Sequence, residues 1–176
     1  MNFQQFLKGK MGFKGISYFK FLLKSTNQHG IHSPFVFAYL TKCLYLKPNK
    51  SQDKTTDVLL KSIPYFNANS IIIRGNDGLK KQIDKDFLKS NEQQTPIDIL
   101  YFESPLNQDS KTVLSHFKLH NDSLILFRGI YHSLEAFAAW NDFVKSPNVT
   151  VSIDLFYCGL LFIRKEQVKQ HFTIRI

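Results

Sequence analysis

The segment SIIIRGNDG, residues 70–78, joins an apolar run to a short loop bounded by Gly75 and Gly78. In α/β proteins a strand followed by a glycine-containing loop often begins a nucleotide or cofactor site, because glycine lets the backbone approach the ligand closely. The same pattern also fits an ordinary tight turn between a strand and a helix. The segment therefore allows two interpretations, a cofactor loop or a structural turn.

Two later strand segments end in charges of opposite sign. Glu103 ends the apolar segment IDILYFE, and Arg128 follows the segment SLILF. A single carboxylate is not a metal site, and an arginine repels a cation, so this pair predicts no metal centre. We expect Glu103 to be a solvent-exposed carboxylate at the strand end. The alternative is that it pairs with Arg128 across neighbouring strand ends. His132 could act as a general base, but no serine or cysteine stands in a nucleophile-elbow pattern beside it.

The elements that position these residues alternate along residues 53–176. Apolar strand segments lie at 70–74, 97–103 and 123–127, and helical patterns lie at about 78–90, 108–119 and 132–146. This alternation predicts a parallel sheet covered by helices on both faces. The segments VTVSIDLF and GLLFIRK then predict an antiparallel hairpin that closes the sheet, and HFTIRI is a candidate edge strand. We therefore predict an α/β fold with a shortened sheet of about five strands.

A basic helical extension, residues 1–52, precedes the α/β domain of residues 53–176. The extension contains eight lysines and no acidic residue, so it carries +8 of the net charge of +9. Its pattern predicts a short first helix, a break at the glycines, a second helix near 16–25, and a third that starts at Ser33 and Pro34. The lysines form either a surface for nucleic acid or anionic membrane, or solvated helix faces. The absence of arginine favours the solvated faces.

Composition narrows the class of protein. A chain of 176 residues with 43% hydrophobic content suits one globular core. No apolar run approaches the roughly 20 residues of a membrane span, and lysines interrupt the N-terminal apolar segments, so neither a transmembrane helix nor a secretory signal is predicted. Cys43 and Cys158 lack metal-ligand or disulfide spacing. We expect both to be core residues of a cytoplasmic protein.

Three segments resemble a known family: FLLKSTNQHGIHSPFVF, HNDSLILF and AWNDFVKSPNVTVSIDLFYCGLLFIRKEQVKQHFTIRI. They are similar to class I S-adenosylmethionine-dependent methyltransferase-like proteins common in Bacteroidetes. The resemblance implies a Rossmann-like methyltransferase sheet behind a helical N-terminal extension, with S-adenosylmethionine as cofactor. It also implies a cofactor loop at Gly75, Asp77 and Gly78, followed by a carboxylate at Glu103.

The chain departs from that family at the positions that hold the cofactor. The acidic residue expected before the glycine loop is Ile73, and its neighbour Arg74 has the wrong charge for a sulfonium cofactor. Only 18 residues separate the loop from the strand at 97–103. Two further strands and their helices, one of which normally carries the ribose-binding carboxylate, need about 50 to 60 residues. Arg128 and Gly129 replace the paired aspartates that help bind a metal in related O-methyltransferases.

Three functional hypotheses follow. In the first, the chain is a degenerate, non-catalytic methyltransferase-like protein without a cofactor, and it acts as an interaction or scaffold module. The apolar edge strand at residues 71–73 would then need covering, either by the N-terminal extension or by a partner, which could be a second copy or another protein. In the second, a rearranged site of Gly75, Asp77, Gly78 and Glu103 still binds S-adenosylmethionine and transfers methyl groups. In the third, residues 1–52 bind nucleic acid or anionic membrane. We adopt the first, with the glycine loop as the remnant of a cofactor loop.

Overall fold

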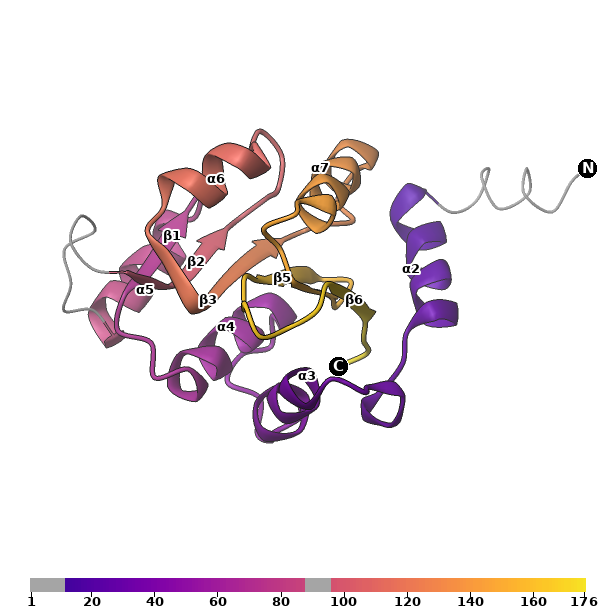
Figure 1. Cartoon of the computed structure of the whole chain (residues 1–176), viewed down its shortest axis with the longest axis horizontal. Helices are drawn as coiled ribbons and strands as arrows, with labels where there is room; N and C mark the ends of the chain where they lie inside the picture. The colour runs from indigo at the N-terminus through magenta and orange to yellow at the C-terminus, as the bar shows by residue number, and fades with distance from the viewer. Residues whose placement is uncertain (1–11, 88–95) are drawn as a thin grey trace, which may run out of the picture.

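The computed structural model describes residues 12–87 and 96–176, which form a six-stranded mixed sheet with helices around it (Figure 1). The strands lie in the order β1-β2-β3-β5-β4-β6. They are Ile71–Arg74 (β1), Ile97–Phe102 (β2), Leu119–Arg128 (β3), Val151–Asp154 (β4), Cys158–Phe162 (β5) and Gln170–Thr173 (β6). The predicted α/β class is confirmed, with six strands in place of about five because β6 pairs in parallel with β4.

Because of the strand directions, several charged residues lie together along the edge formed by the carboxyl ends of the strands, which we call the carboxyl edge. β1, β2 and β3 pair in parallel, and β5 runs antiparallel between β3 and β4. The predicted C-terminal hairpin is therefore confirmed, and β4 points the same way as β1 to β3. The carboxyl ends of these four parallel strands share an edge, where Gly75, Glu103, Arg128 and Asp154 lie.

Helices cover both faces of the sheet, as the alternation of elements predicts. They are α4 (Lys54–Tyr65), α5 (Asp77–Phe87), α6 (Ser110–His116) and α7 (Leu134–Lys145). Alternate strand residues such as Ile73 and Leu126 belong to a buried apolar cluster with α4 and α5. Their neighbours, such as Ile72 and Phe127, belong to a second cluster with α6 and α7. The sheet thus forms the middle of three layers.

A glycine is needed where Trp140 of α7 meets β5. A β-carbon on Gly159 of β5 would lie 2.5 Å from the ring of Trp140, which is buried on α7. Trp140 therefore packs directly on the backbone of β5.

Both cysteines, Cys43 and Cys158, are buried free thiols, as the sequence predicts for core residues.

The N-terminal extension contributes to the same core. α2 (Phe13–Lys24) corresponds to the predicted second helix but begins earlier, so Gly15, which was expected in the break, lies inside it. The predicted first helix lies outside the described residues. α3 (Pro34–Tyr39) begins behind Ser33, whose Oγ accepts a hydrogen bond from the Val36 N–H, as predicted. It continues into a π-helix, Leu40–Leu44. The buried Tyr39 lies in the α4 cluster, with its hydroxyl 2.6 Å from Ser62 Oγ.

α2 lies at the β6 side of the sheet, away from β1 (Figure 1). The Thr26 N–H donates to the Thr173 carbonyl at 2.9 Å, and Thr26 bridges to Ile174. The rings of Tyr18 and Phe21 also contact Phe156. Within the described residues, the extension therefore covers the β6 edge, and β1 remains the terminal strand at the other edge.

Candidate functional site

Arg128, the last residue of β3, joins two carboxylates at the carboxyl edge of the sheet. Its Nη1 and Nη2 donate to Asp53 Oδ2 and Oδ1 at 2.8 and 2.9 Å, which is the strong bidentate geometry of an arginine–carboxylate pair. Its Nε lies 3.2 Å from Glu103 Oε1, just beyond the end of β2. The structure shows the alternative predicted for Glu103, a pairing with Arg128, in place of the free exposed carboxylate that the sequence favoured. The larger contact, with Asp53, was not predicted.

Asp53 connects this ion pair to the start of α4. It is the N-cap residue of that helix, and its Oδ2 also accepts hydrogen bonds from the Thr56 N–H at 2.8 Å and the Thr56 hydroxyl at 2.7 Å. An N-cap carboxylate satisfies backbone donors that have no partner inside the helix. Arg128 thus ties the first turn of α4 to the end of β3.

The second oxygen of Glu103 is also engaged. Its Oε2 accepts hydrogen bonds from the Tyr101 hydroxyl at 2.7 Å and from Asn76 Nδ2 at 2.9 Å. Asn76 Oδ1 in turn accepts the Leu79 N–H at 2.9 Å at the start of α5. We refer to Asp53, Asn76, Tyr101, Glu103 and Arg128 as the strand-end cluster.

The four residues predicted to bind a cofactor separate into two pairs. Gly75 has a φ of +82°, and a β-carbon there would lie 3.1 Å from Glu103 Cβ, so both backbone conformation and close contact call for glycine. Asp77 and Gly78 lie in the exposed first turn of α5. The structure therefore brings Gly75 and Glu103 together, with Asn76 beside them, and leaves Asp77 and Gly78 on the surface.

Mutual compensation fixes the protonation states in the cluster. Partial burial disfavours the charge on Asp53, but hydrogen bonds from Arg128 and Thr56 outweigh it and lower the pKa of Asp53. Burial likewise disfavours the charge on Arg128, and the bonds to Asp53 outweigh it and raise the pKa of Arg128. Burial and then the Glu103 carboxylate raise the pKa of Tyr101. Near pH 7 Asp53 is thus ionised and Tyr101 is neutral, so neither group is set to exchange a proton at that pH.

A small cavity of about 270 Å³ adjoins Arg128. It is lined by Lys14, Asp53, Thr55, Arg128, Gly129, Tyr131, His132, Phe156 and Tyr157. One of these lining residues, Tyr131, donates from its hydroxyl to Asp154 Oδ2 at 2.6 Å, and burial raises the pKa of Asp154 to about 6. The volume of this cavity falls just below the range of about 300–1,000 Å³ that is usual for small-molecule sites.

Three members of the strand-end cluster escaped the sequence-based prediction. Tyr101 carries the clearest signal, because residues two apart on a strand share a face, and Tyr101 precedes Glu103 by two. Asp53 followed by Thr56 is an N-cap pattern, but it indicates only where a helix begins. Asn76 gave no signal beyond its place in the loop.

Comparisons of the chain with protein-family models, curated proteins and solved structures gave no match. The resemblance to methyltransferase-like proteins therefore rests on the three sequence segments alone. Within residues 12–87 and 96–176, no group of three or more His, Cys, Asp or Glu side chains is arranged to hold a metal ion. In the same residues, none of the helices has the length and apolar character needed to cross a bilayer.

Proposed function

We propose that this chain is a methyltransferase-like protein that does not bind S-adenosylmethionine and that acts as an interaction or scaffold module. The proposal rests on one observation: both carboxylate oxygens of Glu103 already have partners within the chain. These partners are Arg128, Tyr101 and Asn76. A cofactor would have to displace these partners at the strand end, where its own polar groups would otherwise be held.

The strand order of the sheet also supports the proposal that the fold is a shortened methyltransferase fold. The reversed strand β5 between β3 and β4 matches the strand pair with which the sheet of a class I methyltransferase ends. β1 is the terminal strand of the described sheet, and only residues 88–96 lie between α5 and β2. Those few residues are too short for two further strands with helices, which need about 50 to 60 residues. Within the described residues, no strand is thus available to carry the carboxylate that would bind the ribose.

Calorimetric titration with S-adenosylmethionine and S-adenosylhomocysteine tests this proposal. We expect no heat of binding at millimolar ligand for the purified full chain. Micromolar binding that Glu103→Gln abolishes, while Asp86→Asn on the exposed side of α5 leaves it intact, would overturn the proposal. That result would favour an active methyltransferase with a rearranged site.

The edge of β1 is the surface that we propose for a protein partner. The Ile99 N–H bonds to the Ser70 carbonyl and the Glu103 N–H to the Arg74 carbonyl, so the even-numbered residues of β1 face β2. In a parallel pair, the backbone groups of Ile71 and Ile73 then point to the outer side. An apolar edge strand of this kind favours pairing with another strand.

Sedimentation velocity tests whether a second copy pairs there. We expect a species heavier than the 20.5 kDa monomer at high protein concentration. Ile73→Pro removes an outward N–H and should return the chain to a monomer, whereas Ile73→Val keeps the N–H and should not. A strict monomer at all concentrations would rule out the homodimer and leave a different protein as the partner.

A second candidate function, binding to an anionic membrane surface, is favoured by the outer side of α2. Phe19 and Leu23, one turn apart, are 52% and 73% exposed, and Lys20 and Lys24 are exposed beside them. Exposed apolar side chains flanked by lysines are typical of helices that lie in the membrane interface. This combination favours a lipid surface over nucleic acid, which would not need the apolar groups.

Co-sedimentation with vesicles tests the second candidate. Deleting the whole extension would remove the buried core residue Tyr39, so point variants are preferable. We expect binding to phosphatidylglycerol vesicles but not to phosphatidylcholine vesicles, and loss of binding in Phe19→Ser/Leu23→Ser. The matched control Leu134→Ser/Val168→Ser changes two residues that are exposed elsewhere. Equal binding of both double variants would exclude α2 as the membrane contact.

A further inference from the structure

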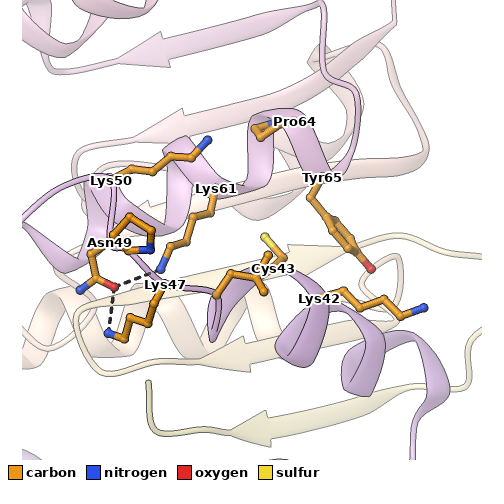
Figure 2. A pocket seen from close by; sticks show the side chains of 10 residues that line it. Lys42, Cys43, Lys47, Asn49, Lys50, Lys61, Pro64 and Tyr65 are labelled. Carbon is orange, nitrogen blue, oxygen red and sulfur yellow. Dashed lines mark hydrogen bonds between the residues drawn. The ribbon is translucent and has the colours of Figure 1, made fainter.

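A second cavity, of about 700 Å³, lies between the π-helix and the C-terminal half of α4 (Figure 2). We call it the lysine pocket; its lining residues are Lys42, Cys43, Leu46, Lys47, Pro48, Asn49, Lys50, Lys61, Pro64 and Tyr65. It shares no lining residue with the cavity beside Arg128. Its volume lies well inside the range of about 300–1,000 Å³ that is usual for small-molecule sites. Part of its wall is a π-helix, an element that often marks functional sites.

The charges around the lysine pocket do not balance. Four of its lining residues are lysines. Within the described residues, only Lys61 of these four forms an ion pair, between its Nζ and Asp57 Oδ2 at 2.8 Å. Asp57 Oδ1 is engaged as well, since it accepts the Lys50 backbone N–H at 2.6 Å. The remaining three ammonium groups, on Lys42, Lys47 and Lys50, give the pocket an excess of positive charge.

Two of the lysine side chains are held in place by a shared acceptor. Lys61, with only 6% of its surface exposed, donates from Nζ to Asn49 Oδ1 at 3.2 Å and to the Leu44 carbonyl at 3.3 Å. Lys47 Nζ donates to the same Asn49 oxygen at 3.0 Å, and the two side chains converge there (Figure 2). Fixed donors lose little conformational entropy when a ligand binds, which favours affinity.

The rest of the wall is apolar. Leu46 is 53% exposed, and the rings of Pro48, Pro64 and Tyr65 also line the cavity. Burial raises the pKa of the Cys43 thiol to about 12, so this thiol stays protonated at neutral pH and is not a nucleophile. The pocket therefore offers a combination of positive charge and apolar surface for binding, without a reactive group.

We propose that the lysine pocket binds a small organic anion, a phosphate or carboxylate attached to an apolar body. The anionic group would lie beside the Lys47 ammonium group, while Lys42 and Lys50 extend from other sides of the pocket (Figure 2) and add longer-range attraction. The apolar body would lie against Leu46 and the proline rings. This role goes beyond the proposed interaction function and uses no residue of the strand-end cluster.

The probe for this site is 1-naphthyl phosphate, which joins a dianion to an apolar ring. We expect it to bind the full chain, in a calorimetric or fluorescence titration, at least about tenfold more tightly than 1-naphthol or inorganic phosphate, each of which has one half of the required chemistry. The double variant Lys42→Gln/Lys47→Gln should weaken binding by about tenfold or more. The matched control Lys111→Gln/Lys118→Gln removes two exposed lysines on and near α6 and should leave the affinity within about twofold.

Three outcomes would overturn the proposal. The first is the absence of 1-naphthyl phosphate binding below millimolar concentration. The second is equal affinity for 1-naphthol, which would show an apolar cavity without a role for the lysines. The third is an equal loss in the two double variants, which would show general attraction to a basic chain. Thermal unfolding checks that each variant is folded. Because all four lysines are exposed, their replacement should leave Tm nearly unchanged.

Discussion

Replacing Arg128 with leucine tests whether the strand-end cluster holds the fold together. Arg128 makes two bonds to Asp53 and one contact with Glu103. Hydrogen bonds between charged groups contribute about 1.5–3 kcal/mol each when buried, and exposed pairs contribute about 0.2–1 kcal/mol. The side chains of Arg128, Asp53 and Glu103 are 34%, 39% and 35% exposed, so the sum should lie near the lower values. We expect a loss of about 2 kcal/mol, equivalent to about 4–8 °C in Tm for a chain of this size.

Urea denaturation of a double-mutant cycle isolates the contact with Asp53. Asp53→Asn is a suitable partner variant, because asparagine caps a helix about as well as aspartate does. We expect a coupling energy of about 1 kcal/mol between Asp53→Asn and Arg128→Leu at pH 7. The control Lys118→Leu, at an exposed cation outside the cluster, should change the free energy of unfolding by less than about 0.5 kcal/mol.

The pH dependence of that coupling has a definite sign. The pKa of Asp53 is lowered in the folded chain, and an unfolded aspartate titrates near pH 3.9. The coupling should therefore be fully present above about pH 4 and disappear as the pH falls through the folded pKa. A coupling of zero at pH 7, or one that persists when Asp53 is protonated, would refute the claim that this ion pair connects α4 to β3.

Two further variants test the packing and the buried charge. Gly159→Ala should lower the free energy of unfolding by about 1–3 kcal/mol because its β-carbon would overlap the Trp140 ring. The control Gly78→Ala, at an exposed position of α5, places a β-carbon no closer than 3.7 Å to any atom and should not destabilise the protein. Equal urea midpoints for the two variants would contradict this prediction. Burial raises the pKa of Asp154 to about 6, above its unfolded value near 3.9, so unfolding free energy should fall as pH rises from about 4 to 6. Asp154→Asn should remove that slope, and unchanged pH profiles would show that Asp154 does not cause it.

The fold was predictable where the apolar pattern is strong on both sides of a strand. The apolar runs at 71–73, 97–102 and 123–127 are buried almost throughout, whereas the first four residues of β3, which the sequence did not predict as strand, are partly buried or exposed. Continuous apolar strands between helices imply a parallel sheet with two covered faces. β6 was the weaker inference, because its side chains are only partly buried at the sheet edge. Its parallel pairing with β4 depends on the path of residues 163–169, which no local pattern specifies.

Of the strand-end cluster, only the contact between residues at the ends of neighbouring strands could be inferred from the sequence. Glu103 follows β2 and Arg128 ends the neighbouring parallel strand β3, so their pairing was an alternative that the inferred sheet allowed, although an exposed Glu103 was favoured. Asp53 lies 75 residues before Arg128 in the chain, and its capping pattern does not tell which strand end the helix will approach. The same limit applies to the lysine pocket, because the charge of +8 in residues 1–52 does not reveal which lysines gather around one cavity.

The strand-end cluster and the lysine pocket differ in how their charges are matched. At the strand ends one guanidinium meets the carboxylates of Asp53 and Glu103, and each charged group already has a partner within the chain. In the lysine pocket, Asp57 compensates Lys61, and three more ammonium groups surround the same cavity. A ligand at the first site would compete with existing bonds between charged groups. An anion at the second would neutralise ammonium groups that have only neutral hydrogen-bond acceptors, such as Asn49 Oδ1 for Lys47 and the Leu60 carbonyl for Lys50. The search for a ligand should therefore begin at the C-terminal half of α4, even though the parallel sheet would ordinarily place a cofactor at its carboxyl edge.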